Sequence, residues 1–376
     1  NIQINSESEN NGDFINVQAL DSNFGIIYSN YESGGQNQIA AFVEWDDFKA
    51  ADKNEDAKKI ILSNGLLNSN VSALTVYPDP SKSTLYVGTE NGQLLKVENA
   101  NAYTGNTNPT SSAIWTPITG SNFLGSISDI EFGKDEDHIF VTFHNYGINN
   151  IFYSKDGGVS WEEKDGNLPN IPVRCILQNP LIEDEIIIGT ELGVWYTKDF
   201  SSENPTWKRA NSGMNDVRVT DMDLRKGDDY KVFAATYGLG VFSSNFSVNE
   251  PLINIDTETK LLKIDQGQSG SFKVNYKVYG GYDEETTFSI SGLPSDILAD
   301  FNPSNSFKIS SDGNIEITLT VGENTPSKIY PLEITSTSLT QTKTTGIELQ
   351  VLSNDIDNDG IKNIDDNCPE TANPNQ

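Results

Sequence analysis

The fold of this chain is decided by one short stretch, Ser154-Lys155-Asp156-Gly157-Gly158-Val159-Ser160-Trp161. Its Asp and Gly residues predict a tight turn between two strands, because the carboxylate can accept hydrogen bonds from the turn's own backbone while Gly adopts the left-handed conformation. Trp161 follows the turn directly, and we expect it to pack between neighbouring sheets. The stretch therefore indicates a fold and gives little reason to expect catalysis.

A repeated pattern surrounds this turn. Each copy has a strand with alternating apolar residues, a turn, a buried strand that ends in a pair such as Gly-Thr, and a Gly turn into the next strand. Copies begin near Ile15, Ser72, Ile127, Val173 and Val219. The repeat distance is roughly 45–60 residues, which suits one four-stranded propeller blade. Since a blade cannot bury both faces alone, the copies predict sheets stacked around an axis.

The complete turn matches the Asp-box pattern, and its surroundings resemble the BNR-repeat β-propellers of secreted bacterial proteins. The resemblance is carried by Phe143–Pro169, Gly189–Trp195 and Ala235–Phe242. A degraded copy of the box is expected at Thr197-Lys198-Asp199 with Trp207. Proteins of this kind include the sortilin-type (Vps10) propellers and the propeller xyloglucanases. In them the box lies on the rim of the propeller, away from the substrate side.

Changes in the pattern divide the chain into four parts, and the predicted fold class is all-β. Residues 1–246 are predicted to form the propeller, incomplete at its N-terminus, with the first blades expected upstream of Asn1. Residues 247–255 are predicted as a linker. Residues 256–352 are predicted as an immunoglobulin-like β-sandwich, because strand and turn signals recur there with clean alternation. Residues 353–376 form a separate acidic segment.

This acidic segment contains a calcium-loop pattern. Side chains at loop positions 1, 3, 5, 9 and 12, together with the carbonyl at position 7, supply the oxygen ligands that Ca²⁺ prefers, and a Gly at position 6 allows the sharp turn. The predicted ligands are Asp355, Asp357, Asp359, the Ile361 carbonyl, Asn363 (directly or through water) and Asp366. The segment resembles the start of a thrombospondin type 3 repeat, which makes Ca²⁺ the expected cofactor.

The two cysteines, Cys175 and Cys368, exclude a disulfide-dense scaffold and a four-cysteine zinc site. In thrombospondin type 3 repeats the cysteine commonly pairs with one in the next repeat, so the native chain is expected to continue. Cys175 lies in an apolar strand and is expected to be a buried free thiol. The order of propeller, sandwich and calcium repeat resembles type IX secretion cargo, which makes that secretion machinery an expected partner.

The chain is strongly acidic. It has 54 acidic and 25 basic residues, for a formal net charge of -29. This charge repels nucleic acid and anionic membranes, and no stretch is apolar for long enough to cross a bilayer. We therefore expect neither a nucleic-acid partner nor membrane insertion. One stretch, Trp45 to Ile61, is compatible with a helix and is expected to be an insertion on a loop.

The sequence offers no clear catalytic centre. A sialidase-like site needs three converging arginines, and nothing favours convergence of the four that are present: Arg174, Arg209, Arg218 and Arg225. Asp221 and Asp223 flank a blade strand, but we do not expect them to act as a hydrolase pair. The chain has only two histidines, His138 and His144, so a zinc site or a His-based triad is not expected. His144 is interpreted as a polar loop residue, with contact to a ligand as the alternative.

Together these features predict a non-enzymatic, secreted or cell-surface binding protein. Its propeller face would meet a glycan or protein, while calcium stiffens the stalk behind it. One alternative is a propeller-type glycoside hydrolase with part of its site in missing N-terminal blades, and another is a structural surface spacer. Turnover would separate the hydrolase from the other two, and saturable binding would separate binder from spacer.

Overall fold

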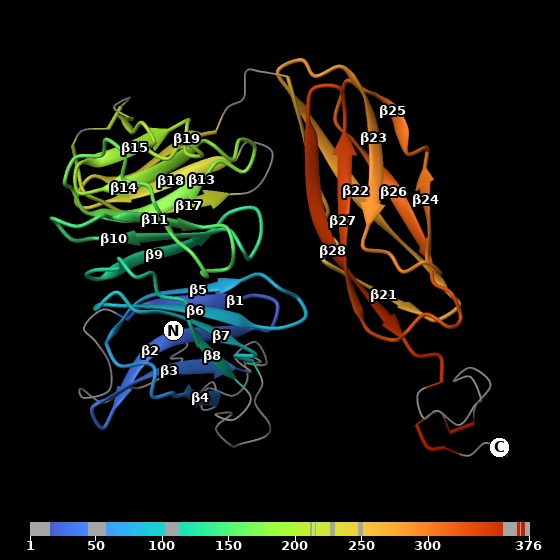
Figure 1. Cartoon of the computed structure of the whole chain (residues 1–376), viewed down its shortest axis with the longest axis horizontal. Coiled ribbons are helices and arrows are strands. Elements are labelled where there is room, and N and C mark those ends of the chain that lie inside the picture. The colour runs from blue at the N-terminus through green and yellow to red at the C-terminus, as the bar shows by residue number, and fades with distance from the viewer. Residues whose placement is uncertain are drawn as a thin grey trace, which may run out of the picture. The chain divides into compact units, whose positions relative to one another are not determined.

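The computed structural model gives two compact units, Asn1–Phe246 and Ser247–Gln376 (Figure 1). It describes residues 16–43, 58–101, 113–210, 213–214, 216–225, 230–246, 251–355, 367–368 and 370–372. The regular elements of these residues are β-strands, which confirms the all-β prediction. No helix in the described ranges is long and apolar enough to span a membrane.

The first unit is a β-propeller array of five antiparallel sheets, which follow one another in chain order in Figure 1. Within each sheet the strands pair in chain order, as successive hairpins. The first two sheets contain β1 (Gln18–Asp21), β2 (Ile26–Ser33), β3 (Gln36–Val43) and β4 (Lys58–Leu62), then β5 (Val71–Tyr77), β6 (Thr84–Thr89), β7 (Leu94–Glu98) and β8 (Ile114–Pro117). The last three contain β9 (Ile127–Phe132), β10 (Ile139–Phe143), β11 (Ile151–Ser154) and β12 (Glu162–Glu163), then β13 (Val173–Gln178), β14 (Ile186–Thr190), β15 (Gly193–Thr197) and β16 (Lys208–Arg209), and finally β17 (Val219–Arg225), β18 (Lys231–Thr236) and β19 (Gly240–Asn245).

Neighbouring sheets meet through their first strands, β1, β5, β9, β13 and β17, each of which contacts the next. In four of the sheets the register between first and second strand shifts at the same place, close to the start of the first strand. The repeat found in the sequence is therefore a repeat of structure, including its bulge. The predicted copies near Ile15, Ser72, Ile127, Val173 and Val219 are confirmed as these five sheets.

Two glycines show why the second strand of a sheet carries a Gly-Thr pair. A Cβ on Gly88 in β6 would lie 2.7 Å from Cγ2 of Ile127, the first residue of the next sheet. A Cβ on Gly189 in β14 would lie 2.6 Å from Cγ1 of Val219, which holds the equivalent place one sheet further on. Ile127 and Val219 are both fully buried. The missing side chain thus lets the next sheet approach closely.

The turn Ser154–Trp161 has the predicted geometry. Asp156 accepts hydrogen bonds from the Ser160 amide at 2.8 Å and from the Ser160 hydroxyl at 2.6 Å. Gly157 and Gly158 have φ angles of 68° and 89°. The Trp161 indole donates to the Ile118 carbonyl at 2.9 Å, and Ile118 directly follows β8. Trp161 therefore ties the third sheet to the second, as the sequence predicted.

The degraded copy of this turn uses the same contacts. The Thr197 hydroxyl donates to Asp199 at 2.5 Å, and Asp199 also accepts from the Thr206 amide at 2.8 Å. The Trp207 side chain is 2% exposed and its indole donates to the Lys164 carbonyl at 2.9 Å. A lengthened turn thus places its tryptophan against the preceding sheet in the same way.

The second unit is a β-sandwich of two sheets with a single core. Its first sheet has the order β20 (Leu252–Asp256), β22 (Ser269–Tyr279), β26 (Gly313–Thr320) and β24 (Leu298–Asn302). Its second sheet has the order β21 (Leu261–Asp265), β28 (Thr342–Leu352), β27 (Ile329–Thr337), β23 (Glu284–Ser291) and β25 (Ser306–Ile309), with a parallel pair between β21 and β28. Side chains of both sheets share one hydrophobic cluster. The finer immunoglobulin-like assignment stays a prediction.

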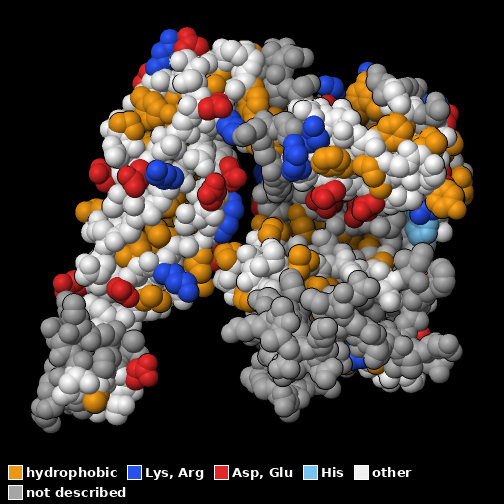
Figure 2. Space-filling view, turned by 180° about the vertical axis from the view of Figure 1, so that it is seen from behind, with side chains coloured by type: hydrophobic (Ala, Val, Ile, Leu, Met, Phe, Trp, Pro, Cys, Tyr) orange, Lys and Arg blue, Asp and Glu red, His pale blue; other side chains and the backbone are white. Residues whose placement is uncertain are grey.

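Acidic and basic side chains are scattered among hydrophobic and other side chains over the face of the sandwich that Figure 2 shows. The sandwich begins earlier than predicted, because Leu252–Asp256 is strand β20 and pairs with β22. The linker predicted over residues 247–255 is therefore wrong for residues 252–255, which belong to β20.

The helix-compatible reading of Trp45 to Ile61 is wrong for its last residues, because Lys58–Leu62 forms β4 and pairs with β3. The sheet supplies partners that a local propensity argument cannot see. Residues 45–57 lie outside the described ranges.

We predict that Gly189→Ala destabilises the propeller by about 1–3 kcal/mol, because the added methyl group overpacks the contact with Val219 and with the Cys175 thiol. Urea unfolding followed by tryptophan fluorescence measures this loss. Gly65→Ala is the matched control, since a Cβ there meets nothing within 4 Å. Equal stability of the two variants would contradict the proposed role of this glycine.

Candidate functional site

One backbone hydrogen bond recurs on one face of the propeller. In four sheets, the residue that follows the second strand donates its amide to a carbonyl just before the first strand. The pairs are Glu90 to Asn70 (2.9 Å), His144 to Ser126 (3.3 Å), Glu191 to Pro172 (3.3 Å) and Tyr237 to Arg218 (2.9 Å). We call this side the loop face. It comprises the turns between second and third strands together with the connections that enter the first strands.

The four equivalent positions of the loop face carry different chemistry on one backbone geometry. They present two carboxylates, one imidazole and one phenol ring, at Glu90, Glu191, His144 and Tyr237. Loops held by a rigid scaffold are where proteins place binding residues, because side chains can change there without disturbing the core. The loop face is therefore the candidate functional surface.

Two arginines meet on Glu191. Arg174 donates to one carboxylate oxygen through Nε at 2.7 Å and Nη2 at 2.6 Å, and Arg218 donates to the other through Nε at 2.7 Å. Burial alone would raise the pKa of Glu191, but the bonds and charges of the two arginines outweigh it and hold that pKa below its ordinary value. Glu191 is thus ionised and occupied, which suits positioning better than proton transfer.

The remaining arginines do not complete an open cluster. Arg209 donates to the Leu192 carbonyl at 3.5 Å and to Asp216. Arg225 ends β17. Convergence of the arginines was not expected, yet two of them do converge on one carboxylate, that of Glu191. Arg218 also lies 5.1 Å from the ring centre of Tyr237, which is 71% exposed.

The two histidines have different surroundings. Burial lowers the pKa of His144, and the charge of Arg174 lowers it further, so the ring is neutral at pH 7. Its Nδ1 is buried without a hydrogen-bond partner among the described residues. His138 lies between β9 and β10, where its Nδ1 contacts Asp135. Only His144 is therefore on the loop face, where it remains the alternative ligand contact.

The first strands carry a second group of ionisable side chains. Asp129, Cys175 and Asp221 hold equivalent positions next to the bulges of β9, β13 and β17. Asp129 accepts from the Ile176 amide of β13 at 3.0 Å. Burial raises the pKa of Asp129 to about 7, with a further contribution from Asp221. Cys175 is buried, and burial raises the pKa of its thiol.

The neighbouring acid Asp223 is exposed, and each of the two β17 acids accepts from the next amide in its own strand, Met222 for Asp221 and Leu224 for Asp223. Burial also raises the pKa of Asp221. These hydrogen bonds are local, and the charge of Asp223 adds to the rise in the pKa of Asp221. That the two acids are not a hydrolase pair stays a prediction.

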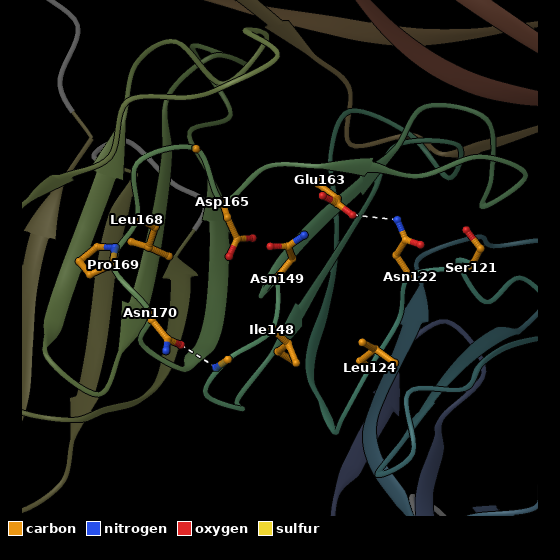
Figure 3. Close-up of a pocket in the computed structure, with 12 residues that line it drawn as sticks. Ser121, Asn122, Leu124, Ile148, Asn149, Glu163, Asp165, Leu168, Pro169 and Asn170 are labelled. Carbon is orange, nitrogen blue, oxygen red and sulfur yellow. Dashed lines mark hydrogen bonds between the residues drawn. The ribbon is translucent and has the colours of Figure 1, made fainter.

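A groove of about 630 Å³ opens on the loop face beside the third sheet (Figure 3). One wall is formed by residues 121–124, between β8 and β9, and the other by residues 163–170, between β12 and β13. The turn between β10 and β11 lies between them. The lining residues are Ser121, Asn122, Leu124, Gly147, Ile148, Asn149, Glu163, Asp165, Gly166, Leu168, Pro169 and Asn170. Sequence reasoning missed this groove, because its residues look like ordinary turn residues.

Hydrogen bonds fix the groove on both sides. Asn122 donates across it to Glu163 at 2.8 Å, and Asn170 accepts from the Gly147 amide at 2.6 Å, as Figure 3 shows. Asp165 accepts from the backbone amides of Asn150 and Ile151 at 2.8–2.9 Å. The Asn122–Glu163 bond links the two walls. The bonds of Asn170 and Asp165 link the second wall to the turn between β10 and β11 and to the start of β11, so the groove is shaped before any ligand arrives.

The two carboxyls of the groove differ in environment. Burial raises the pKa of Asp165 to about 6 against the opposing effect of its backbone hydrogen bonds, and the nearby charge of Glu163 raises it further. Glu163 is exposed to solvent. One carboxyl is thus partly protonated near neutral pH while its neighbour faces the solvent.

The predicted calcium ligands lie almost wholly outside the described residues. Of the six, only Asp355 is described, and Asp357, Asp359, Ile361, Asn363 and Asp366 are not. The start of the segment is fixed to the sandwich, because the Asn354 amide donates to Gln266 at 3.1 Å and the Ser353 hydroxyl donates to the Asp355 carbonyl at 2.6 Å. No group of three potential metal ligands occurs among the described residues.

Residues 353–376 match the thrombospondin type 3 repeat family. No curated protein matches the chain. Among solved structures it is similar to the GH74 enzyme of Niastella koreensis, at 14% identity and a TM-score of 0.37, with 89% of this chain and 60% of that chain covered.

Two further similarities are weaker. The surface layer protein SbsC, domains 1–6, shows 11% identity and a TM-score of 0.22, with 90% of this chain and 50% of that chain covered. A family 123 glycoside hydrolase from Clostridium perfringens shows 14% identity and a TM-score of 0.23, with 27% of each chain covered. The chain spans less than two thirds of each of these three chains, and the scores are too low to indicate what it does.

We predict that Asp129→Asn stabilises the propeller at pH 8, by up to about 4 kcal/mol, and leaves its stability nearly unchanged at pH 4. The folded-state pKa of Asp129 is raised from 3.8 to about 7. Its contribution is therefore complete below pH ~4 and is lost as the pH rises through 7. Urea unfolding at the two pH values measures the difference. Asp223→Asn controls for loss of a negative charge, and an Asp129→Asn effect that is equal at both pH values would refute the prediction.

Proposed function

We propose that this protein is a secreted or cell-surface binding protein. The loop face of its propeller binds a glycan or protein ligand. The observation that carries the proposal is the recurring backbone hydrogen bond of that face, which holds Glu90, His144, Glu191 and Tyr237 at equivalent positions. Scaffold and recognition are separated there, as in other proteins that bind through loops. Export by type IX secretion, suggested by the order of the domains, belongs to the same proposal.

Binding without catalysis is favoured by the state of the Arg174–Glu191–Arg218 cluster. Glu191 is held by two arginines and its pKa is lowered, so it is a poor proton donor at neutral pH. The family match of residues 353–376 supports an extracellular location.

A specific observation favours a second candidate, a glycoside hydrolase. Two carboxyls, Glu163 and Asp165, line one groove, and the pKa of Asp165 is raised to about 6. Hydrolases of this class use an acid with a raised pKa opposite an ionised carboxylate. Against this, Asp165 is held by two backbone amides, which gives it a structural role.

The purified chain, incubated with a panel of plant, algal and host polysaccharides, tests both candidates. We expect saturable retention on at least one polysaccharide and no release of soluble sugar. Release that Asp165→Asn abolishes would establish the hydrolase instead. If the chain is not retained and no sugar is released, glycan binding is contradicted. A protein ligand or a role as a surface spacer is then favoured.

Calcium is proposed to order the segment after the sandwich, with Asp355, Asp357, Asp359, Ile361, Asn363 and Asp366 as ligands. Thrombospondin type 3 repeats bind calcium, and the family match covers all six residues. Bound Ca²⁺ would bring together carboxylates that otherwise repel one another.

Chelation of calcium is therefore expected to speed amide hydrogen exchange in residues 355–368 by at least tenfold, while exchange in the sandwich strands stays constant. Hydrogen exchange with and without chelator measures this, and Asp357→Asn with Asp359→Asn should abolish the response. Identical exchange in residues 355–368 under both conditions would refute the calcium assignment.

A further inference from the structure

We propose that the groove between residues 121–124 and 163–170 is a subsite for an uncharged sugar chain. This inference rests on the proposed function and deepens it, because it assigns one part of the loop face and one class of ligand. It follows from the chemistry of the lining, from its charge and from the way the groove is held open.

The lining combines the two kinds of group that a sugar ring needs. Ser121 and the three amides of Asn122, Asn149 and Asn170 can donate and accept hydrogen bonds, as sugar hydroxyls do. Apolar groups lie among them, at Leu124, Ile148, Leu168 and Pro169. These can cover the C–H faces of the rings, and the volume of about 630 Å³ lies within the usual range of small-ligand sites.

Two polar groups of the groove are available to a ligand. No hydrogen bond holds the side chains of Ser121 and Asn149 to other described residues, and both are exposed. Figure 3 shows Asn149 between the two walls, next to Asp165. Leu124, on the wall that includes Ser121, is 61% exposed. An exposed leucine beside uncommitted polar groups offers a ligand both kinds of contact at once.

The charge of the groove argues against an anionic ligand. Its twelve lining residues include Glu163 and Asp165 but no Lys, Arg or His. A sulfated or uronic-acid chain would bring negative charge against these carboxyls with no cation to offset it. The whole chain, with its formal net charge of -29, adds to this repulsion.

A cationic peptide is also disfavoured, because both carboxyls already have partners. Asp165 accepts from two backbone amides, and Glu163 accepts from Asn122 at 2.8 Å. The polar groups that remain uncommitted are neutral.

The groove is also preorganised. The Asn122–Glu163 hydrogen bond links the two walls, and the Gly147–Asn170 hydrogen bond links one of them to the central turn. Asn145 of that turn accepts from the Ser126 amide at 2.8 Å. A ligand therefore does not have to order these loops, which lowers the entropy cost of binding.

Titration calorimetry with cellohexaose, xylohexaose and mannohexaose tests the assignment on the full chain, and trigalacturonate and a Lys-rich hexapeptide serve as charged probes. We expect at least one neutral hexasaccharide to bind. Asn149→Ala should weaken that binding about fivefold and the double variant with Leu124→Ala at least tenfold. Both side chains are exposed, so the variants should fold, and thermal melting checks this. Asn314→Ala, an exposed asparagine of the sandwich, is the matched control.

Tyr237→Ala, at the other end of the loop face, separates failure of this inference from failure of the proposed function. Neutral sugar binding that Tyr237→Ala removes and Asn149→Ala leaves intact would overturn the groove assignment but keep the loop face as a binding surface. Binding of the charged probes alone, or of no neutral hexasaccharide, would overturn the assignment of an uncharged sugar chain.

Discussion

The structure of the propeller depends on the close approach of each first strand to the second strand of the preceding sheet. Gly88 and Gly189 leave no side chain where Ile127 and Val219 of the next sheet press in, and both of these residues are fully buried. The tryptophans of the outer turns, Trp161 and Trp207, tie the third sheet to the second and the fourth sheet to the third through indole hydrogen bonds. Contacts at the inner and outer ends together fix the angle between sheets, since packed interiors resist small displacements.

A fixed scaffold of this kind explains how the loop face can vary. In four of the five sheets the same backbone hydrogen bond closes the turn, whatever side chain the donating residue carries. In the fourth sheet the place holds Glu191, which is used to order two arginines. In the third it holds His144, and the adjoining turn becomes the central element of the groove. The side chains available for recognition thus lie on the loop face, while the contacts that stabilise the repeat lie between the sheets.

Local rules gave much of the fold. The turn pattern predicted the hydrogen bonds of Asp156 and the position of Trp161, and the alternating strands located all five sheets. The rules failed at Lys58–Leu62 and Leu252–Asp256, where strand formation depends on partners supplied by β3 and β22. Each segment is only five residues long, and its own sequence pattern is too short to predict a strand. β-Propensity depends mainly on context, here on the partner strand.

By itself, the sequence determined the repeat, its turns, the change to a second all-β unit and the acidic segment that matches a thrombospondin type 3 repeat, because each is encoded within a few neighbouring residues. The tertiary structure alone decided which polar side chains meet. Arg174 lies in β13, Glu191 follows β14 and Arg218 precedes β17. Asn122 contacts Glu163 from 41 residues away. Such contacts depend on how sheets stack, and no local pattern records that geometry.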